Sequence, residues 1–107
     1  INEYPFMIKI ERSSYSKRPS NKIIYLDKNI DKPLKLRKFE RGDFFYPYGM
    51  NGKKKVSKFF KDEKLSTFEK QMKWILTDAN NQILWIVGMR VDRRLIKNRG
   101  ECLKISL

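Results

Sequence analysis

The sequence contains no histidine and only one cysteine, Cys102, in 107 residues. Histidine is the commonest general base, and histidine and cysteine together hold most structural zinc ions, so their scarcity argues against both kinds of site. A single cysteine also excludes an intramolecular disulfide, which fits a reducing compartment. We therefore expect no catalytic residue, no metal site and no cofactor in this chain.

Long apolar runs are also missing from the sequence. No stretch approaches the roughly 18 apolar residues of a membrane-spanning helix, and no charged start leads into an apolar block as in a signal peptide. The sequence starts with Ile1 rather than Met, which suggests a processed form or a fragment of a longer protein. We expect a soluble, cytoplasmic protein with no membrane partner.

Acidic residues are few relative to basic ones. The 25 Lys and Arg residues outnumber the 12 Asp and Glu residues, which gives a formal net charge of +13 and a pI near 10.0. Residues 37–64 and 89–107 carry most of the excess, whereas residues 65–88 are neutral. Two basic segments around a neutral centre favour a polyanionic partner such as nucleic acid. A charge that serves only solubility is the alternative.

The hydrophobic pattern predicts a single α+β domain over residues 1–107. Hydrophobic residues make up 40% of the chain, enough for a packed core. Short alternating or β-branched stretches are typical of strands, and the two most apolar stretches flank an Asx-rich turn, as in a hairpin. We expect a mixed or antiparallel sheet or a sandwich-like core. The predicted strands are residues 6–10, 22–27, 34–39, 72–77, 82–91 and 101–107, with loops at 13–22 and 27–33.

One main helix is predicted near residues 54–63. Val56, Phe59 and Phe60 fall at positions i, i+3 and i+4 and make one apolar stripe. Leu103, Ile105 and Leu107 similarly share one face of the last predicted strand. The aromatic residues expected to pack in the core, rather than to stack on bases, are Phe44, Phe45, Tyr46, Tyr48, Phe59, Phe60, Trp74 and Trp85.

Three consecutive lysines, Lys53–Lys55, occupy the predicted start of this helix. Positive charge is mildly unfavourable there, because the helix dipole already places positive potential at the N-terminus. The same turn exposes backbone N–H groups that bind phosphate. We therefore predict that the helix start, with Lys58 and Lys61, grips a nucleic-acid backbone. A solvated lysine face over an apolar core is the alternative.

A second basic group, Arg90, Arg93 and Arg94, follows the most apolar predicted strand. Planar guanidinium groups suit phosphates and base edges. Ion pairs with Asp92 or Glu101 are the alternative. Neither GxxxxGK[ST] nor GxGxxG occurs in the sequence, so nucleotide-binding loops of those kinds are excluded.

The segments "LRKFERGDFFYPYGMNGKKKVSKFFKDEKL" and "ILWIVGMRVDRR" resemble the C-terminal substrate-recognition domain of bacterial tRNA(Ile)-lysidine synthetase. That family combines an Arg, Gly-Asp, an aromatic residue, Pro-x-Gly, a further Gly, Lys-Lys and a Phe-Phe helix with a later Trp-(Val/Ile)-x-Gly-x-Arg strand. The resemblance is strongest over residues 36–94. Its backbone motif residues here are Gly42, Asp43, Pro47, Gly49, Gly52 and Gly88.

The resemblance implies a fold shared with a domain of the phenylalanyl-tRNA synthetase β chain. It also implies that the chain is part of a larger ligase in tRNA processing. Such enzymes use ATP, Mg²⁺ and lysine to convert the wobble cytidine of the isoleucine tRNA with a CAU anticodon to lysidine. Their active site lies in an N-terminal domain whose SGGxDS motif is absent here. The C-terminal domain is expected to hold the tRNA acceptor stem.

The charge pattern and the family resemblance together indicate which residues bind tRNA. The expected partners are this tRNA and the enzyme's own catalytic domain, and a homodimer is left open. A general RNA- or DNA-binding module without sequence preference, or a protein-interaction domain docking on the catalytic domain, are the alternative functions. The predicted tRNA-binding residues are Lys53, Lys54, Lys55, Lys58, Lys61, Arg37, Arg90, Arg93 and Arg94.

Overall fold

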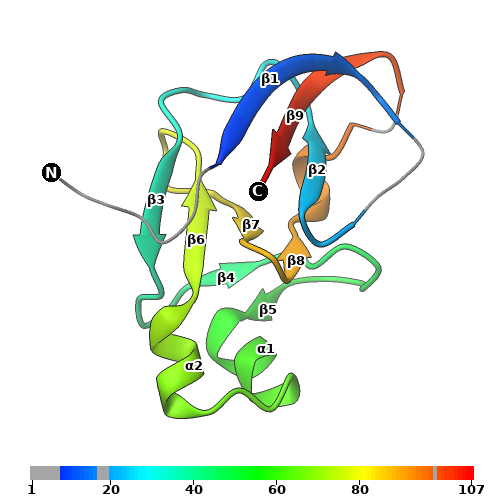
Figure 1. Ribbon diagram of the computed structural model, residues 1–107. Coiled ribbons are helices and arrows are strands. Elements are labelled where there is room, and N and C mark those ends of the chain that lie inside the picture. The colour runs from blue at the N-terminus through cyan, green and yellow to red at the C-terminus, as the bar shows by residue number, and fades with distance from the viewer. Residues whose placement is uncertain (1–7, 17–19, 98) are drawn as a thin grey trace, which may run out of the picture.

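Antiparallel sheets and short helices build the chain (Figure 1). The structure is a computed structural model, and it describes residues 8–16, 20–97 and 99–107. The expected α+β class is confirmed. In chain order the elements are β1 (Lys9–Ser14), β2 (Ile23–Leu26), β3 (Lys35–Lys38), β4 (Phe44–Phe45), β5 (Lys54–Lys55), α1 (Val56–Asp62), α2 (Thr67–Met72), β6 (Trp74–Thr77), β7 (Ile83–Ile86), β8 (Arg90–Val91), a 3₁₀-helix (Arg93–Leu95) and β9 (Glu101–Ser106).

β9 is the central strand of a three-stranded sheet with the order β1-β9-β2. The predicted strands at 22–27 and 101–107 are confirmed as β2 and β9. Leu103 and Ile105 are buried in the core as predicted, whereas Leu107 lies beyond the end of the strand and is exposed. Leu103 and Ile105 therefore share one buried face of the central strand, and Cys102 on its other face is buried as well.

β1 differs from the predicted strand 6–10. It runs to Ser14, into the predicted loop 13–22, while residues 6–7 lie outside the described part of the chain. β1 pairs with β9 along its whole length, and the last pair joins Ser14 to Glu101. Antiparallel hydrogen bonding over six residue pairs keeps this polar segment extended, which local composition does not reveal.

β6 and β7 form the predicted hairpin inside a second sheet, with the order β3-β6-β7-β8. Its turn is closed by buried Asp78, whose Oδ1 accepts the N–H groups of Asn80 and Gln82, each at 2.9 Å. The prediction of one strand over 82–91 is wrong, because the chain turns at Gly88, where φ is +79°. That backbone conformation ends β7, and the chain returns as β8 beside it.

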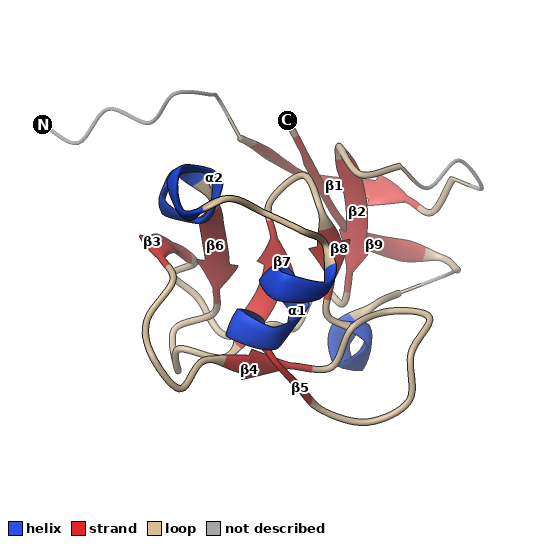
Figure 2. Ribbon diagram, turned by 90° about the horizontal axis from the view of Figure 1, so that it is seen from below, coloured by secondary structure: helices blue, strands red, loops and turns tan. Residues whose placement is uncertain are grey.

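The four-stranded sheet is covered on both faces, which explains why β7 is apolar at every position. One cluster lies between the two larger sheets and consists of Ile24, Leu26, Ile30, Leu76, Leu84, Trp85, Val87, Leu103 and Ile105. The other lies under α1, which Figure 2 shows in front of β7, and consists of Phe45, Val56, Phe59, Phe60, Ile75, Ile83 and Ile86.

Half of the predicted aromatic core positions are confirmed. Phe59, Phe60 and Trp85 are almost fully buried, and Phe45 joins them. Trp74 is only half-buried: it packs against the first cluster, and the Lys38 ammonium lies 3.8 Å from its ring centroid. Aromatic rings thus fill both cores, where each contributes more buried area than an aliphatic side chain.

The predicted helix start is wrong. Lys54–Lys55 form β5, which pairs with Phe44–Phe45 in β4, and α1 begins only at Val56. The Val56 N–H donates to the Asp43 carbonyl oxygen at 2.9 Å, so the first donor of the helix already has a partner inside the protein. Lys54 and Lys55 are held in place by pairing with β4. The three lysines predicted for the first turn of the helix therefore precede the helix.

Helix α2 has no counterpart among the predicted elements. It begins with a capping box, in which the Ser66 Oγ accepts the Glu69 N–H at 3.1 Å and the Glu69 Oε1 accepts the Ser66 N–H at 2.8 Å. The hydrogen bond from the Ser66 backbone holds the pKa of Glu69 below its ordinary value. None of the residues of α2 is buried, so the helix has no apolar stripe that periodicity could detect.

Gly49 and Gly52 occupy the left-handed region, with φ of +84° and +76°. Nothing lies within 4 Å of a Cβ built at either position, so an added side chain would meet backbone strain and no clash. Gly52→Ala is expected to lower the free energy of unfolding by about 1–2 kcal/mol. Gly52→Asn should lower it less, because Asn tolerates this region. Urea denaturation measures both, and wild-type stability of Gly52→Ala would contradict the argument.

Candidate nucleic-acid interface

The glycine-rich segment 41–53 lies against β8 and the 3₁₀-helix that follows it. The Tyr48 N–H donates to the Val91 carbonyl oxygen at 2.9 Å, and the Arg93 N–H donates to the Tyr46 carbonyl oxygen at 2.8 Å. These bonds bring together the two basic segments that the apolar hairpin separates in the sequence. We call this contact region the junction.

The buried carboxylate of Asp92 organises the junction. Asp92 is only 2% exposed; its Oδ2 accepts the Tyr46 N–H at 2.9 Å, and its Oδ1 accepts the Arg94 N–H at 2.8 Å. The Arg94 guanidinium adds an Nη2–Oδ2 contact of 2.9 Å, which confirms the ion-pair alternative for this arginine. A buried carboxylate is tolerated only when it is paired and hydrogen-bonded, so the two segments hold each other in place.

Cationic groups lie over aromatic rings at the junction. The Lys53 ammonium is 4.5 Å from the centroid of the Phe44 ring, and the Arg94 guanidinium is 4.2 Å from that of Tyr46. Arg93 also lies over the Tyr46 ring, at 5.4 Å. The two rings meet edge to face with centroids 6.3 Å apart. Such cation–π contacts hold the charged groups near the rings without neutralising them.

Lys55 belongs to the same surface, because it is directly opposite Phe44 in the β4–β5 register and cross-strand partners share a face. The prediction that the aromatic side chains of this segment pack is wrong for Phe44 and Tyr48, which are 42% and 57% exposed. We call the surface the cation–aromatic face. It consists of Phe44, Tyr46, Lys53, Lys55, Arg93 and Arg94.

Lys54 points to the other side of β5 and is bound within the protein. Its Nζ lies 2.6 Å from the Asp62 Oδ2, and only 17% of its side chain is exposed. The hydrogen bond from Lys54 holds the pKa of Asp62 below its ordinary value, and Lys58 adds a longer contact of 3.5 Å. Lys61 lies in the last turn of α1 and has no ion pair among the described residues.

Arg37 forms a two-pronged ion pair with Asp43, with Nη1–Oδ2 at 2.8 Å and Nη2–Oδ1 at 2.9 Å. Only 19% of the Arg37 side chain is exposed, and the hydrogen bonding to Asp43 raises its pKa. The Asp43 Oδ2 also accepts the Glu40 N–H at 2.8 Å. These two motif residues therefore anchor the start of the glycine-rich segment to β3.

Arg90 lies at the edge of the junction. Its Nη1 donates to the Tyr48 carbonyl oxygen at 3.2 Å, and its guanidinium lies 5.6 Å from the Phe59 ring centroid. No carboxylate pairs with Arg90 within the described residues, so its charge is not neutralised. The predicted tRNA-binding residues therefore fall into three groups. Lys53, Lys55, Arg93 and Arg94 share the cation–aromatic face, Lys58 and Lys61 lie on α1 with Arg90 at the edge of the junction, and Lys54 and Arg37 are bound within the protein.

Metal ligands, membrane-spanning helices and the single thiol were the other features to locate in the structure. Residues 8–16, 20–97 and 99–107 hold no group of three or more His, Cys, Asp or Glu side chains able to bind a metal ion. None of the helices in these same ranges is long and apolar enough to cross a membrane. Cys102 is buried, and burial raises the pKa of its thiol, away from a reactive thiolate.

Fold and site define the chain as a small α+β domain with a strongly basic face. Its sequence matches the family model described as the TilS substrate C-terminal domain over residues 34–107. The chain therefore belongs to this family, and the sequence resemblance over residues 36–94 is confirmed.

Relatives named tRNA(Ile)-lysidine synthase occur in Parabacteroides distasonis, 45% identical over 76 residues, and in Bacillus subtilis, 36% identical over 85 residues. The matches cover 70% and 76% of this chain but 17% and 18% of the relatives, so the chain spans about a fifth of their length. A solved structure described as the crystal structure of TILS C-terminal domain aligns with a TM-score of 0.80 at 26% identity. That alignment covers 92% of this chain and 80% of the other.

Asp92→Ala is expected to lower the free energy of unfolding by about 3–5 kcal/mol, because it leaves a guanidinium and two backbone N–H groups without their partner. Asp92→Asn, which keeps one acceptor oxygen, should lose less. Asp62→Ala removes an ion pair whose carboxylate is 40% exposed and serves as the control, with a smaller expected loss. Urea denaturation compares the three, and equal effects of Asp92→Ala and Asp62→Ala would show that Asp92 does not organise the junction.

Proposed function

We propose that this chain is the C-terminal tRNA-binding domain of a tRNA(Ile)-lysidine synthase and that its cation–aromatic face lies against the tRNA acceptor stem. Family membership supports an RNA partner, because the relatives' name specifies a tRNA. The observation that carries the proposal is the face itself, where cations lie over the exposed Phe44 ring and the half-buried Tyr46 ring while the Asp92 carboxylate is buried.

Lysines on this side of the molecule supply affinity. Lys53 and Lys55 lie on the cation–aromatic face, and Lys58 and Lys61 lie on α1, which directly follows β5. An ammonium group binds phosphate as a point charge and releases condensed counterions from the RNA, so binding weakens steeply as salt rises. Phosphate contacts fix the position of the RNA and carry little sequence information.

Arginines are the better candidates for telling one tRNA from another. A-form RNA offers its shallow groove and its 2′-hydroxyl groups to proteins, since its major groove is too narrow for side chains. Arg90 and Arg93 have no carboxylate partner within the described residues, and apart from the bond from the Arg90 Nη1 to the Tyr48 carbonyl oxygen their donors are available for such contacts. The fork of Arg94 is held by Asp92, which leaves its plane over Tyr46.

In this proposal the chemistry belongs to the catalytic part of the longer enzyme. That part would use ATP, Mg²⁺ and lysine to convert the wobble cytidine of the isoleucine tRNA with a CAU anticodon to lysidine, in the cytoplasm. This domain would hold the far end of the same tRNA and contribute binding energy and orientation. A homodimer is not required, and it stays a prediction.

Replacing Lys53, Lys58 and Lys61 together by Ala is expected to weaken tRNA binding. The slope of log K against log salt should fall by about one for each phosphate that the protein no longer neutralises. The matched control replaces Lys9, Lys28 and Lys104, which carry the same charge but lie with β1, β9 and the β2–β3 loop, away from α1 in Figure 1. Binding to the isoleucine tRNA is measured by salt titration, with circular dichroism to confirm folding.

Equal losses in the two triple variants would mean that only net charge matters and would contradict the proposed interface. Unchanged binding by the folded Lys53, Lys58 and Lys61 variant would contradict it as well. The methionine tRNA that shares the CAU anticodon is the competitor in the same titration. Equal binding of the two tRNAs would favour the alternative of an RNA-binding module without sequence preference.

A second function, docking on the catalytic part of the enzyme, is favoured by α2. This helix buries none of its residues, and its Phe68 and Met72 are 69% and 51% exposed. Large apolar side chains that are exposed to solvent are typical of an interface with another protein. The relatives extend well beyond the matched region, so a further part of the enzyme could supply that surface. The test measures association of the chain with the catalytic part in the absence of RNA. Loss of this association in Phe68→Ala would support the docking function, and unchanged association would contradict it.

A further inference from the structure

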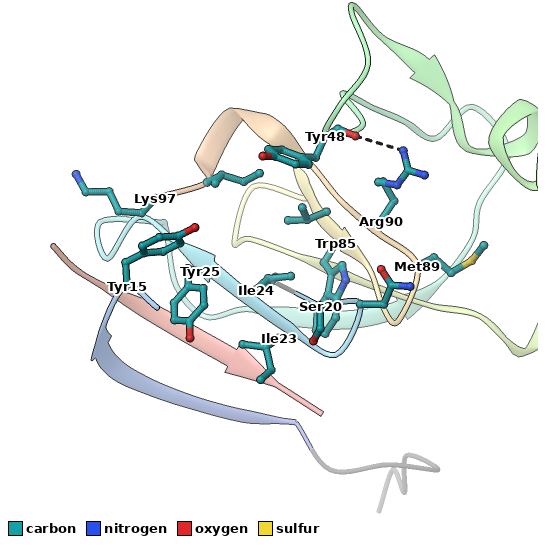
Figure 3. Close-up of a pocket in the computed structure, with 13 residues that line it drawn as sticks. Tyr15, Ser20, Ile23, Ile24, Tyr25, Tyr48, Trp85, Met89, Arg90 and Lys97 are labelled. Atoms are coloured by element: carbon teal, nitrogen blue, oxygen red, sulfur yellow. Dashed lines mark hydrogen bonds between the residues drawn. The ribbon is translucent and has the colours of Figure 1, made fainter. Parts of the chain in front are cut away.

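A pocket of about 350 Å³ lies beside the junction, with Tyr48 and Arg90 in its lining (Figure 3). Tyr48, which follows the junction residues Tyr46 and Pro47, forms part of its wall. Arg90 lies beside it, joined to the Tyr48 carbonyl oxygen by the hydrogen bond drawn in Figure 3. The pocket therefore shares Tyr48 and Arg90 with the edge of the junction, and its volume lies in the range of small-ligand sites.

Aromatic rings from distant parts of the chain line this pocket. Trp85 of β7 and Tyr25 of β2 are buried, while Tyr15 meets the Tyr25 ring edge to face with centroids 5.2 Å apart. Tyr48 contributes the exposed ring at the mouth. Trp85, at 1% exposed, therefore lies deepest in the protein among these rings.

The charged residues of the pocket wall favour an anionic ligand. Arg90 and Lys97 are the charged residues of the pocket wall, and no Asp or Glu belongs to it among the described residues. Ser20 and Asn21 add hydrogen-bonding groups at one side. Aromatic rings with a cation and without a carboxylate are the combination that binds an unstacked base and its phosphate. A purely apolar ligand would leave these polar groups unpaired.

We infer that the pocket receives one unpaired nucleotide of the bound RNA, with its base against the aromatic lining and its phosphate toward Arg90. This inference rests on the proposed function and deepens it. The cation–aromatic face binds the duplex by charge, and the pocket adds a contact that only an unstacked base can make. RNA with a single-stranded extension is therefore bound more tightly than a blunt duplex.

The test compares binding of a blunt RNA duplex and of the same duplex with a single-stranded extension to the 107-residue chain. The extension is expected to tighten binding about tenfold, a gain typical of base stacking on aromatic side chains. Tyr48→Ala should remove that gain, and Tyr48→Phe should keep it because the ring remains. Phe68→Ala, which removes an exposed ring from α2, is the control and should leave the gain unchanged.

A second readout reports on the floor of the pocket. The NMR signal of the Trp85 indole N–H should shift with the extended duplex and not with the blunt one. Equal binding of the two RNAs by the wild-type chain, or a gain retained in Tyr48→Ala, would overturn the inference. If the blunt duplex still binds with the expected salt dependence, only the pocket inference has failed. If neither RNA binds, the proposed function has failed with it.

Discussion

The buried carboxylate of Asp92 is the contact on which the basic surface depends. It accepts hydrogen bonds from the backbone of the glycine-rich segment and from Arg94, so one charge fixes two segments that are far apart in the sequence. Without it, like charges on the two segments would repel each other with no carboxylate between them. The cation–aromatic face therefore owes its geometry to a buried acidic residue.

Some basic residues are bound in ion pairs within the protein, and others are not. Arg37 is bound by Asp43 and Lys54 by Asp62, and both cations are mostly covered. They stabilise the loop that carries the surface lysines and are poorly placed to bind a phosphate. Carboxylates are few in the sequence, and five of the predicted tRNA-binding cations have no ion pair among the described residues: Lys53, Lys55, Lys61, Arg90 and Arg93. The resulting surface is mildly unstable alone and favourable beside a polyanion.

The fold class, the β6–β7 hairpin and several strands could be predicted, because apolar residues alternate or cluster along these segments of the sequence. The start of α1 could not, since the extended shape of Lys54–Lys55 comes from pairing with Phe44–Phe45, a contact that no local pattern encodes. α2 lacks an apolar stripe, although the spacing of Ser66 and Glu69 was a readable capping signal. The candidate site was predicted as charged residues only, because exposure of Phe44 and the pocket depend on how distant segments meet.

The most direct test of the central claim is a map of backbone amide shifts on adding the isoleucine tRNA to the labelled chain. The account predicts that the largest shifts fall in residues 44–55 and 90–94, the two segments joined by Asp92. Amides of β1 and β9, on the other side of the molecule, should change little. Shifts concentrated in β1 and β9, or spread evenly over the basic surface, would contradict the account.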